Sequence, residues 1–268
     1  MLLWSRKGQT EFSASWRIGT PIKWIGFTKV FASTPHICIL KFMTQDEALE
    51  ILKMGHNVFL TGPAGSGKTF VLNKYLEYLR RCGVEAGVTA STGIAATHIG
   101  GMTIHSWAGI GIKDDLSSNE FHDLTKKDRL VKRLEKTKVL VIDEVSMLHH
   151  FRLDLVDRVL RMFAGNLKPF GGMQVVLVGD FFQLPPVTRA GGTAARFAHE
   201  SAAWQNMELR TCYLEEQYRQ DDERYLRVLN DIRGSRVGES TLVPLRERYR
   251  KTISLPVTPT KLHVHNVD

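Results

Sequence analysis

Cysteine is scarce in this chain of 268 residues, which has only Cys38, Cys82 and Cys212. A scattered set of odd number excludes a disulfide scaffold and a zinc site built on paired cysteines, and it favours a reducing compartment. Long apolar runs are also lacking, because no stretch reaches the roughly 18 apolar residues that a membrane-spanning helix needs. Hydrophobic residues nevertheless make up 43% and charged residues 24%. This composition excludes collagen-like, mucin-like and wholly disordered chains, and it predicts a soluble globular protein of one to two domains.

Acidic residues are nearly absent from residues 1–42, where Glu11 stands alone against six lysines and arginines. This segment therefore supplies most of the net charge of +8, and overall basicity is a weak argument for a polyanionic partner. It also shows no clear helical or strand periodicity. We expect a poorly ordered extension, or residues that precede a true start at Met43, with a mitochondrial presequence as the alternative.

Regular signals begin at Met43. Thr44 followed by Glu47 predicts a capping box that opens a helix over 45–54, and a buried strand is expected over 57–61. A glycine-rich turn then leads into a helix that ends at Gly83. Further buried strands are expected over 87–90, 138–143 and 174–179, with helical segments over 121–136 and 150–163. This alternation predicts an α/β fold with a parallel sheet covered by helices on both faces.

The glycine-rich turn reads GPAGSGKT and lies between a strand and a helix, as a P-loop must. Its glycines allow backbone N–H groups to point at phosphates, and the helix that follows adds its positive N-terminal end. Lys68 is expected to neutralise the β- and γ-phosphates, and the hydroxyl of Thr69 to bind Mg²⁺. The alternative is a glycine turn that merely contains Lys-Thr. The expected nucleotide-binding residues are Gly62, Pro63, Ala64, Gly65, Ser66, Gly67, Lys68 and Thr69.

A second acidic anchor follows the apolar strand over 138–143. Asp143 would stand at the carboxyl edge of the sheet, where open α/β sheets bind ligands, and would hold the Mg²⁺ ion, through water. The adjacent Glu144 can polarise the attacking water as a general base. An Asp-Glu pair after a strand can also be a simple surface turn, but its combination with the P-loop favours catalysis.

Six motifs together resemble those of the Pif-type DNA helicases, which are superfamily 1B motors related to the RecD-like enzymes. The resemblance covers about residues 43–268 and implies a P-loop RecA-like domain with ATP as substrate and Mg²⁺ as cofactor. It also implies movement from 5′ to 3′ on single-stranded DNA, with unwinding at duplex junctions. The motifs, in the family's order, are GPAGSGKT, ASTGIAA (90–96), TIHSWAGIG (103–111), VIDEVSML (141–148), GDFFQLPPV (179–187) and LEEQYRQ (214–220).

The resemblance assigns roles to three further residues around the nucleotide. Gln45 is similar to the family's adenine-reading glutamine, although it can also be a polar residue of a first helical turn. Gln183 resembles the glutamine that senses the γ-phosphate, with a solvated loop residue as the alternative. Arg219 resembles the arginine that reaches the γ-phosphate, and a stacking or surface role is its alternative.

DNA contacts are expected from Ser91, Thr92, His105 and Trp107. Hydroxyl groups can contact phosphates without reading sequence, and an aromatic ring offers a stacking face to any base. The alternatives are that Trp107 belongs to the core and that His105 is structural. The lysine-rich and arginine-rich run over 126–138 has a helical apolar stripe, so its charges are interpreted first as a solvated face and second as a DNA contact.

The expected organisation is an extension over 1–42, an ATPase domain over 43–235, and a linker with the start of a second motor domain over 236–268. Because the later family motifs are not found, we expect this chain to bind nucleotide weakly, and to hydrolyse it or unwind DNA poorly, unless completed. We expect a monomer with no membrane association, cytoplasmic in a prokaryote and nuclear or mitochondrial in a eukaryote. Two other functions stay open: a P-loop ATPase that moves no DNA, and a non-catalytic nucleotide-binding or single-strand-binding module.

Overall fold

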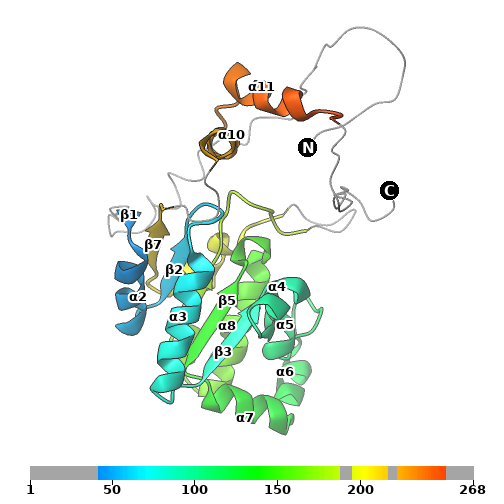
Figure 1. Ribbon diagram of the computed structural model, residues 1–268. Coiled ribbons are helices and arrows are strands. Elements are labelled where there is room, and N and C mark those ends of the chain that lie inside the picture. The colour runs from blue at the N-terminus through cyan, green and yellow to red at the C-terminus, as the bar shows by residue number, and fades with distance from the viewer. Residues whose placement is uncertain (1–41, 188–194, 217–221, 252–268) are drawn as a thin grey trace, which may run out of the picture. The chain divides into compact units, whose positions relative to one another are not determined.

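A parallel sheet forms the centre of the computed structural model, which describes residues 42–187, 195–216 and 222–251. Its seven strands lie in the order β1-β7-β2-β6-β5-β3-β4, and every neighbouring pair is parallel (Figure 1). The predicted α/β class and parallel sheet are therefore confirmed. The strands are β1 (Phe42–Met43), β2 (Val58–Thr61), β3 (Ala86–Ala90), β4 (Met102–Thr103), β5 (Val139–Asp143), β6 (Gln174–Val178) and β7 (Arg210–Leu214).

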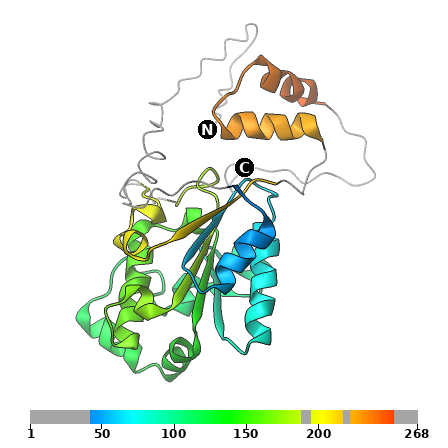
Figure 2. The same cartoon turned by 90° about the vertical axis from the view of Figure 1, so that its left-hand side faces the viewer.

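Helices cover both faces of the sheet, with α2 and α3 on one side and α8 on the other (Figure 2). The α-helices are α2 (Gln45–Lys53), α3 (Lys68–Arg81), α4 (Gly93–His98), α5 (Ile104–Trp107), α6 (Ser118–Thr125), α7 (Asp128–Lys136), α8 (His150–Ala164), α9 (Ala202–Asn206), α10 (Glu223–Arg233) and α11 (Glu239–Arg248). Short 3-10 turns lie at η1 (Val145–Met147), η2 (Pro169–Gly172) and η3 (Ala198–Glu200). No helix of the described ranges is long and apolar enough to cross a membrane.

Side chains from the two faces of the central strands pack into two separate hydrophobic cores. Val139 and Val141 of β5 pack in the cluster that includes Leu72 of α3, whereas Leu140 and Ile142 pack in the cluster that includes α8. Side chains alternate between the faces of a strand, so a strand covered on both sides must be apolar throughout. This requirement explains the continuous apolar runs on which the strand predictions rested.

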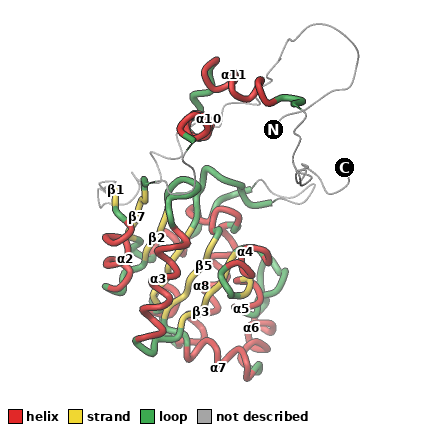
Figure 3. Tube along the Cα trace, viewed as in Figure 1, coloured by secondary structure: helices red, strands yellow, loops and turns green. Residues whose placement is uncertain are grey.

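The carboxyl ends of the parallel strands bring their following loops to one end of the sheet. The loops after β2 and β5 meet there, as the tube in Figure 3 shows. Ligands of open α/β sheets bind at this edge, outside the carboxyl ends of the strands. The fold therefore places the P-loop and the Asp143-Glu144 pair at the same edge, although they are far apart in the sequence.

Several element predictions needed correction. The helical segment expected over 121–136 is two helices, α6 and α7, because Lys127 has extended backbone angles that interrupt the helix. Strand β7, which pairs with β2, was not predicted, since its alternation of apolar and polar residues is short. Phe42, placed in the expected extension, belongs to β1, and residues 1–41 lie outside the described part. Residues 239–248 form α11, and the assignment of 236–268 to a second domain stays a prediction.

Trp107 is a core residue, so the prediction that it stacks on DNA bases was wrong. It is 2% exposed and packs in the cluster beside α8. A Cβ atom built at Gly87 of β3 would lie 2.6 Å from Cζ2 of its ring. The ring therefore fills the space that the missing side chain leaves over β3, where no base can reach it.

This packing predicts that Gly87→Ala is destabilising. The added methyl group collides with the Trp107 ring, and overpacking a core typically costs about 1–3 kcal/mol. Urea unfolding should show a lower midpoint. Gly93→Ala is the matched control, because Gly93 opens α4 and its new methyl group would meet no atom within 4 Å beyond its chain neighbours and its own helix backbone. Equal midpoints for the two variants would contradict the packing argument.

Candidate nucleotide-binding site

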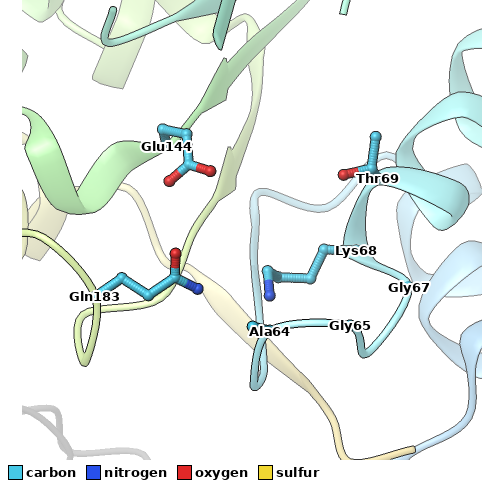
Figure 4. Close-up of a pocket in the computed structure, with 7 residues that line it drawn as sticks. All are labelled: Ala64, Gly65, Gly67, Lys68, Thr69, Glu144 and Gln183. Atoms are coloured by element: carbon cyan, nitrogen blue, oxygen red, sulfur yellow. The ribbon is translucent and has the colours of Figure 1, made fainter. Parts of the chain in front are cut away.

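A cavity of about 370 Å³ opens at the carboxyl edge of the sheet (Figure 4). The loop after β2, the first turn of α3, the turn after β5 and the loop after β6 all contribute to it. Its lining residues are Ala64, Gly65, Gly67, Lys68, Thr69, Glu144 and Gln183. The structure thus brings together residues of the P-loop, of the acidic turn after β5 and of the glutamine motif after β6.

The P-loop takes a path that requires glycine at two close approaches. Gly62 (φ 148°) runs so near the backbone of β7 that a Cβ would collide with the carbonyl oxygen of Leu214. At Gly67 (φ 85°) a Cβ would collide with the amide of Gln45. Both φ values lie in the region where a side chain is strained. The loop therefore curls tightly beneath the cavity, as a phosphate cradle requires.

Gln45 lies beside this loop, at the start of α2. Its Nε2 donates a hydrogen bond to the carbonyl oxygen of Ser66 at 3.4 Å. The capping box of Thr44 and Glu47 was correctly predicted, and it sets where α2 begins. Gln45 is therefore held next to the P-loop by both the helix start and a direct contact, while its reading of adenine stays a prediction.

Lys68 folds back over the loop. Its Nζ donates to the carbonyl oxygens of Gly62 at 2.8 Å and Pro63 at 2.9 Å. Burial lowers the pKa of Lys68 most strongly, although the nearby carboxylates of Asp180 and Glu144 raise it. Because the ammonium group is only partly compensated, a bound anion at this place would be stabilised by it.

Asp143 and Glu144 stand where β5 ends. Glu144 has left-handed backbone angles (φ 52°), and its main-chain N–H donates to Oδ1 of Asp143 at 2.8 Å. Burial raises the pKa of Asp143. Burial and then the neighbouring charge of Asp143 raise the pKa of Glu144. Glu144 lines the cavity, whereas Asp143 is not among the seven lining residues. The turn thus separates the two carboxylates and aims Glu144 at the cavity (Figure 4).

These raised pKa values predict a pH-dependent gain from Glu144→Gln. A carboxyl whose pKa is higher in the folded state binds more protons there, so stability falls as pH rises above the ordinary value of 4.5. The neutral amide avoids this loss. We expect a higher melting temperature for Glu144→Gln at pH 7 and none of that gain below pH 4.5.

Thermal melts at both pH values test this expectation. Glu85→Gln is the control, because Glu85 is exposed and should melt like the parent at either pH. A melting temperature of Glu144→Gln that is equal to the parent's at pH 7 would show that burial does not penalise this charge.

Two residues near the cavity were missed from the sequence: Asp180 and Arg233. Oδ2 of Asp180 accepts hydrogen bonds from Nε2 of Gln183 at 3.2 Å and from Nη1 of Arg233. Asp180 comes shortly after β6, much as Asp143 ends β5. An acidic residue at the carboxyl edge of the sheet could therefore have been predicted to lie near the site. Arg233 gave no signal, since it lies 53 residues further along the chain.

The expected DNA residues lie near the carboxyl edge of β3 and in α5. The Ser91 hydroxyl donates to the carbonyl oxygen of Glu144 at 2.8 Å, and the Thr92 hydroxyl caps α4 by accepting from the N–H of Ala95 at 3.2 Å. Burial, with a smaller effect of Arg152, lowers the pKa of His105 and favours its neutral form. Through this hydrogen bond, Ser91, which follows β3, is linked to the turn that carries Glu144.

Three further expectations concern Thr69, Arg219 and the basic run over 126–138. Thr69 is exposed at the first turn of α3, and its hydroxyl faces the cavity (Figure 4). Arg219 lies outside the described residues. In the basic run, α7 buries Leu130 and Leu134 while Lys132 is exposed, as a solvated charged face requires.

The chain is similar to known proteins over most of its length. The PIF1-like helicase family model matches residues 44–231. A Pif1 ATP-dependent DNA helicase of Psychrobacter is 49% identical over 235 residues, which are 84% of this chain and 35% of that protein. The chain thus spans about a third of the length of this curated relative.

Solved structures give the same result. The crystal structure of Pif1 helicase from Candida albicans has a TM-score of 0.74 and 35% identity, over 81% of this chain and 50% of that one. The Bacteroides Pif1 helicase, in complex with ADP-AlF3 and single-stranded DNA, has a TM-score of 0.69 and 33% identity, over 81% and 52%. With the family model matching most of the chain, this protein belongs to the PIF1-like helicase family.

Proposed function

We propose that the chain carries the ATP-hydrolysing part of a DNA helicase that moves from 5′ to 3′ on single-stranded DNA. One observation carries this proposal: Lys68, Glu144 and Gln183 line a single cavity, although they come from three separate segments of the chain. The similarity to Pif1 helicases, including one in complex with ADP-AlF3 and single-stranded DNA, supports the same function. Duplex junctions would be the substrate for unwinding.

Each residue of the cavity would have its own role in phosphoryl transfer. The P-loop N–H groups and the N-terminal end of α3 hold the phosphates, and Lys68 neutralises their charge. Glu144 accepts a proton from the attacking water, and its raised pKa brings it nearer to the working pH of a general base. Gln183 would sense the γ-phosphate, and Arg219 of the LEEQYRQ motif would contribute a positive charge to its recognition. Gln45 pairs with the edge of adenine.

A magnesium ion would be held by Thr69 and Asp143. Hard oxygen ligands of this kind suit Mg²⁺, which binds through one or two carboxylates together with substrate phosphates. Burial of Asp143 and Glu144 leaves two carboxylates whose charged forms are disfavoured, and a divalent cation stabilises such forms. The ion would neutralise charge that develops on the phosphates.

DNA would be bound without sequence reading, since hydroxyl groups contact phosphates of any sequence. Ser91, Thr92 and His105 are the candidate contacts. Ser91 also contacts the carbonyl oxygen of Glu144, which supports a link between DNA and the catalytic turn. The protein would act as a monomer, in whichever compartment holds the DNA.

ATP turnover with and without oligo-dT tests the proposal. We expect turnover to rise when single-stranded DNA is added, and Thr92→Ala to weaken the binding of a labelled oligonucleotide. Turnover that ignores DNA would favour the P-loop ATPase that moves none. Nucleotide binding without any turnover would instead favour a non-catalytic binding module.

A further inference from the structure

We propose that Asp180 and Arg233 are a positioning pair, which orients the Gln183 amide at the cavity and links it to α10. This inference rests on the proposed function and deepens it, since it concerns how the γ-phosphate is recognised. Neither residue is expected to touch the nucleotide. They act through Gln183.

Asp180 holds the Gln183 loop from within. It is 1% exposed and follows directly after Gly179 at the end of β6. Its main-chain carbonyl oxygen accepts from the N–H of Gln183 at 2.9 Å, and its Oδ1 accepts from the N–H of Phe182 at 3.1 Å. Its Oδ2 accepts from Nε2 of Gln183 at 3.2 Å. Gln183 is thus held through both its backbone and its side chain.

The contact with Nε2 decides which end of the amide faces a phosphate. A glutamine amide offers two N–H donors on one side and an acceptor oxygen on the other. The carbonyl oxygen would repel a phosphate, while an N–H can donate to it. Because Asp180 accepts one N–H, it fixes the nitrogen and leaves the second N–H available. In Figure 4 the amide nitrogen points toward the P-loop and the oxygen toward Glu144.

Arg233 pairs with the buried carboxylate of Asp180 and holds it in place. An ionised carboxylate as buried as this one needs a partner, because an unpaired buried charge is strongly unfavourable. Arg233 pairs with Oδ2 of Asp180, and its guanidinium lies 4.3 Å from the centre of the Phe182 ring. The same oxygen therefore serves Gln183 and Arg233. Loss of the arginine would free the carboxylate to move away from the amide.

This pair connects the sensor to a separate helical element. Arg233 is the last residue of α10, and α10 is joined to α11 by a hydrogen bond from Thr241 to Asp231 at 2.6 Å. An ion pair between Arg224 and Glu247 at 2.9 Å adds a second link. A shift of Gln183 toward a γ-phosphate would therefore pull on Asp180, Arg233 and both helices.

Titrations of the whole chain with Mg-ADP and with a magnesium-loaded, non-hydrolysable ATP analogue test the pair. The readout is the preference for triphosphate over diphosphate, which a merely structural role would not change. We expect Asp180→Asn and Arg233→Gln to reduce this preference roughly tenfold while ADP affinity stays unchanged, as for a lost hydrogen bond to a charged group. Arg233→Lys keeps the charge and should restore much of the preference.

Two further variants serve as controls, one that should lose the preference for triphosphate and one that should keep it. Gln183→Ala should remove the preference, and Arg227→Gln, which removes an exposed charge from the same helix, should leave it intact. If Asp180→Asn fails to fold, Arg233→Gln decides, because its substitution lies at the end of α10 and outside the sheet. A preference that stays at the parent's value in Arg233→Gln, while Gln183→Ala loses it, would overturn the pair alone. A parent chain that binds neither nucleotide would overturn the proposed function and the pair together.

Discussion

Lys68→Ala is expected to weaken the binding of magnesium-loaded ATP by about a hundredfold or more. The ammonium group contributes charge-assisted hydrogen bonds to the phosphates, and hydrogen bonds to charged groups are each worth about 1.5–3 kcal/mol. The group already lies at the loop, where it donates to Gly62 and Pro63. Burial lowers its pKa, so an anion would compensate a charge that the protein alone leaves partly unbalanced.

Isothermal titration measures the loss directly. Arg80→Ala removes an exposed positive charge from the other end of the same helix, and it should bind like the parent. Thermal melts of all three proteins separate a lost binding site from a lost fold. Equal affinities in Lys68→Ala and the parent would rule out this loop as the phosphate site.

Glu144→Gln is expected to reduce ATP turnover by about 10²–10⁴-fold, the usual contribution of a general base. Binding of ATP should persist, because the amide has the same shape and removes a negative charge that would face the phosphates. The raised pKa of Glu144 supports the role, since burial and the charge of Asp143 make its carboxylate a stronger base than an exposed one.

Turnover at saturating ATP, with single-stranded DNA present, tests the role of Glu144, and a separate titration follows binding. Glu85→Gln changes an exposed glutamate and should leave both quantities as they are. Nucleotide binding with a turnover that Glu144→Gln does not change would mean that this residue is no base. Glu144→Gln is expected to have both a lower turnover and, at pH 7, a higher melting temperature than the parent. This combination would show that the charge of Glu144 serves turnover and lowers the stability of the fold.

The P-loop and the strand runs could be predicted because their determinants are local. A glycine-rich turn between a buried strand and a helix carries its geometry in adjacent residues, and strands covered on both faces must be apolar at every position. The Asp143-Glu144 turn followed from the same edge rule. Its left-handed backbone at Glu144 did not, since no residue type there announces it.

Trp107 shows where local reasoning failed. Its sequence context, TIHSW, is the same whether the ring faces solvent or β3. The choice depends on Gly87, which lies 20 positions earlier and leaves the space that the ring fills. Asp180 and Arg233 were missed for a related reason, because their pairing joins the end of β6 to the end of α10.

The fold class, the glycine-rich turn, the acidic turn and the membership of a helicase family could all be recognised from the amino-acid sequence, because each shows in one or more short residue patterns. The packing of distant segments sets which side chains meet at the cavity, which aromatic ring is buried, and how Gln183 is oriented. Those outcomes depend on the distances between segments that the sheet brings together, and no neighbouring residues encode such distances.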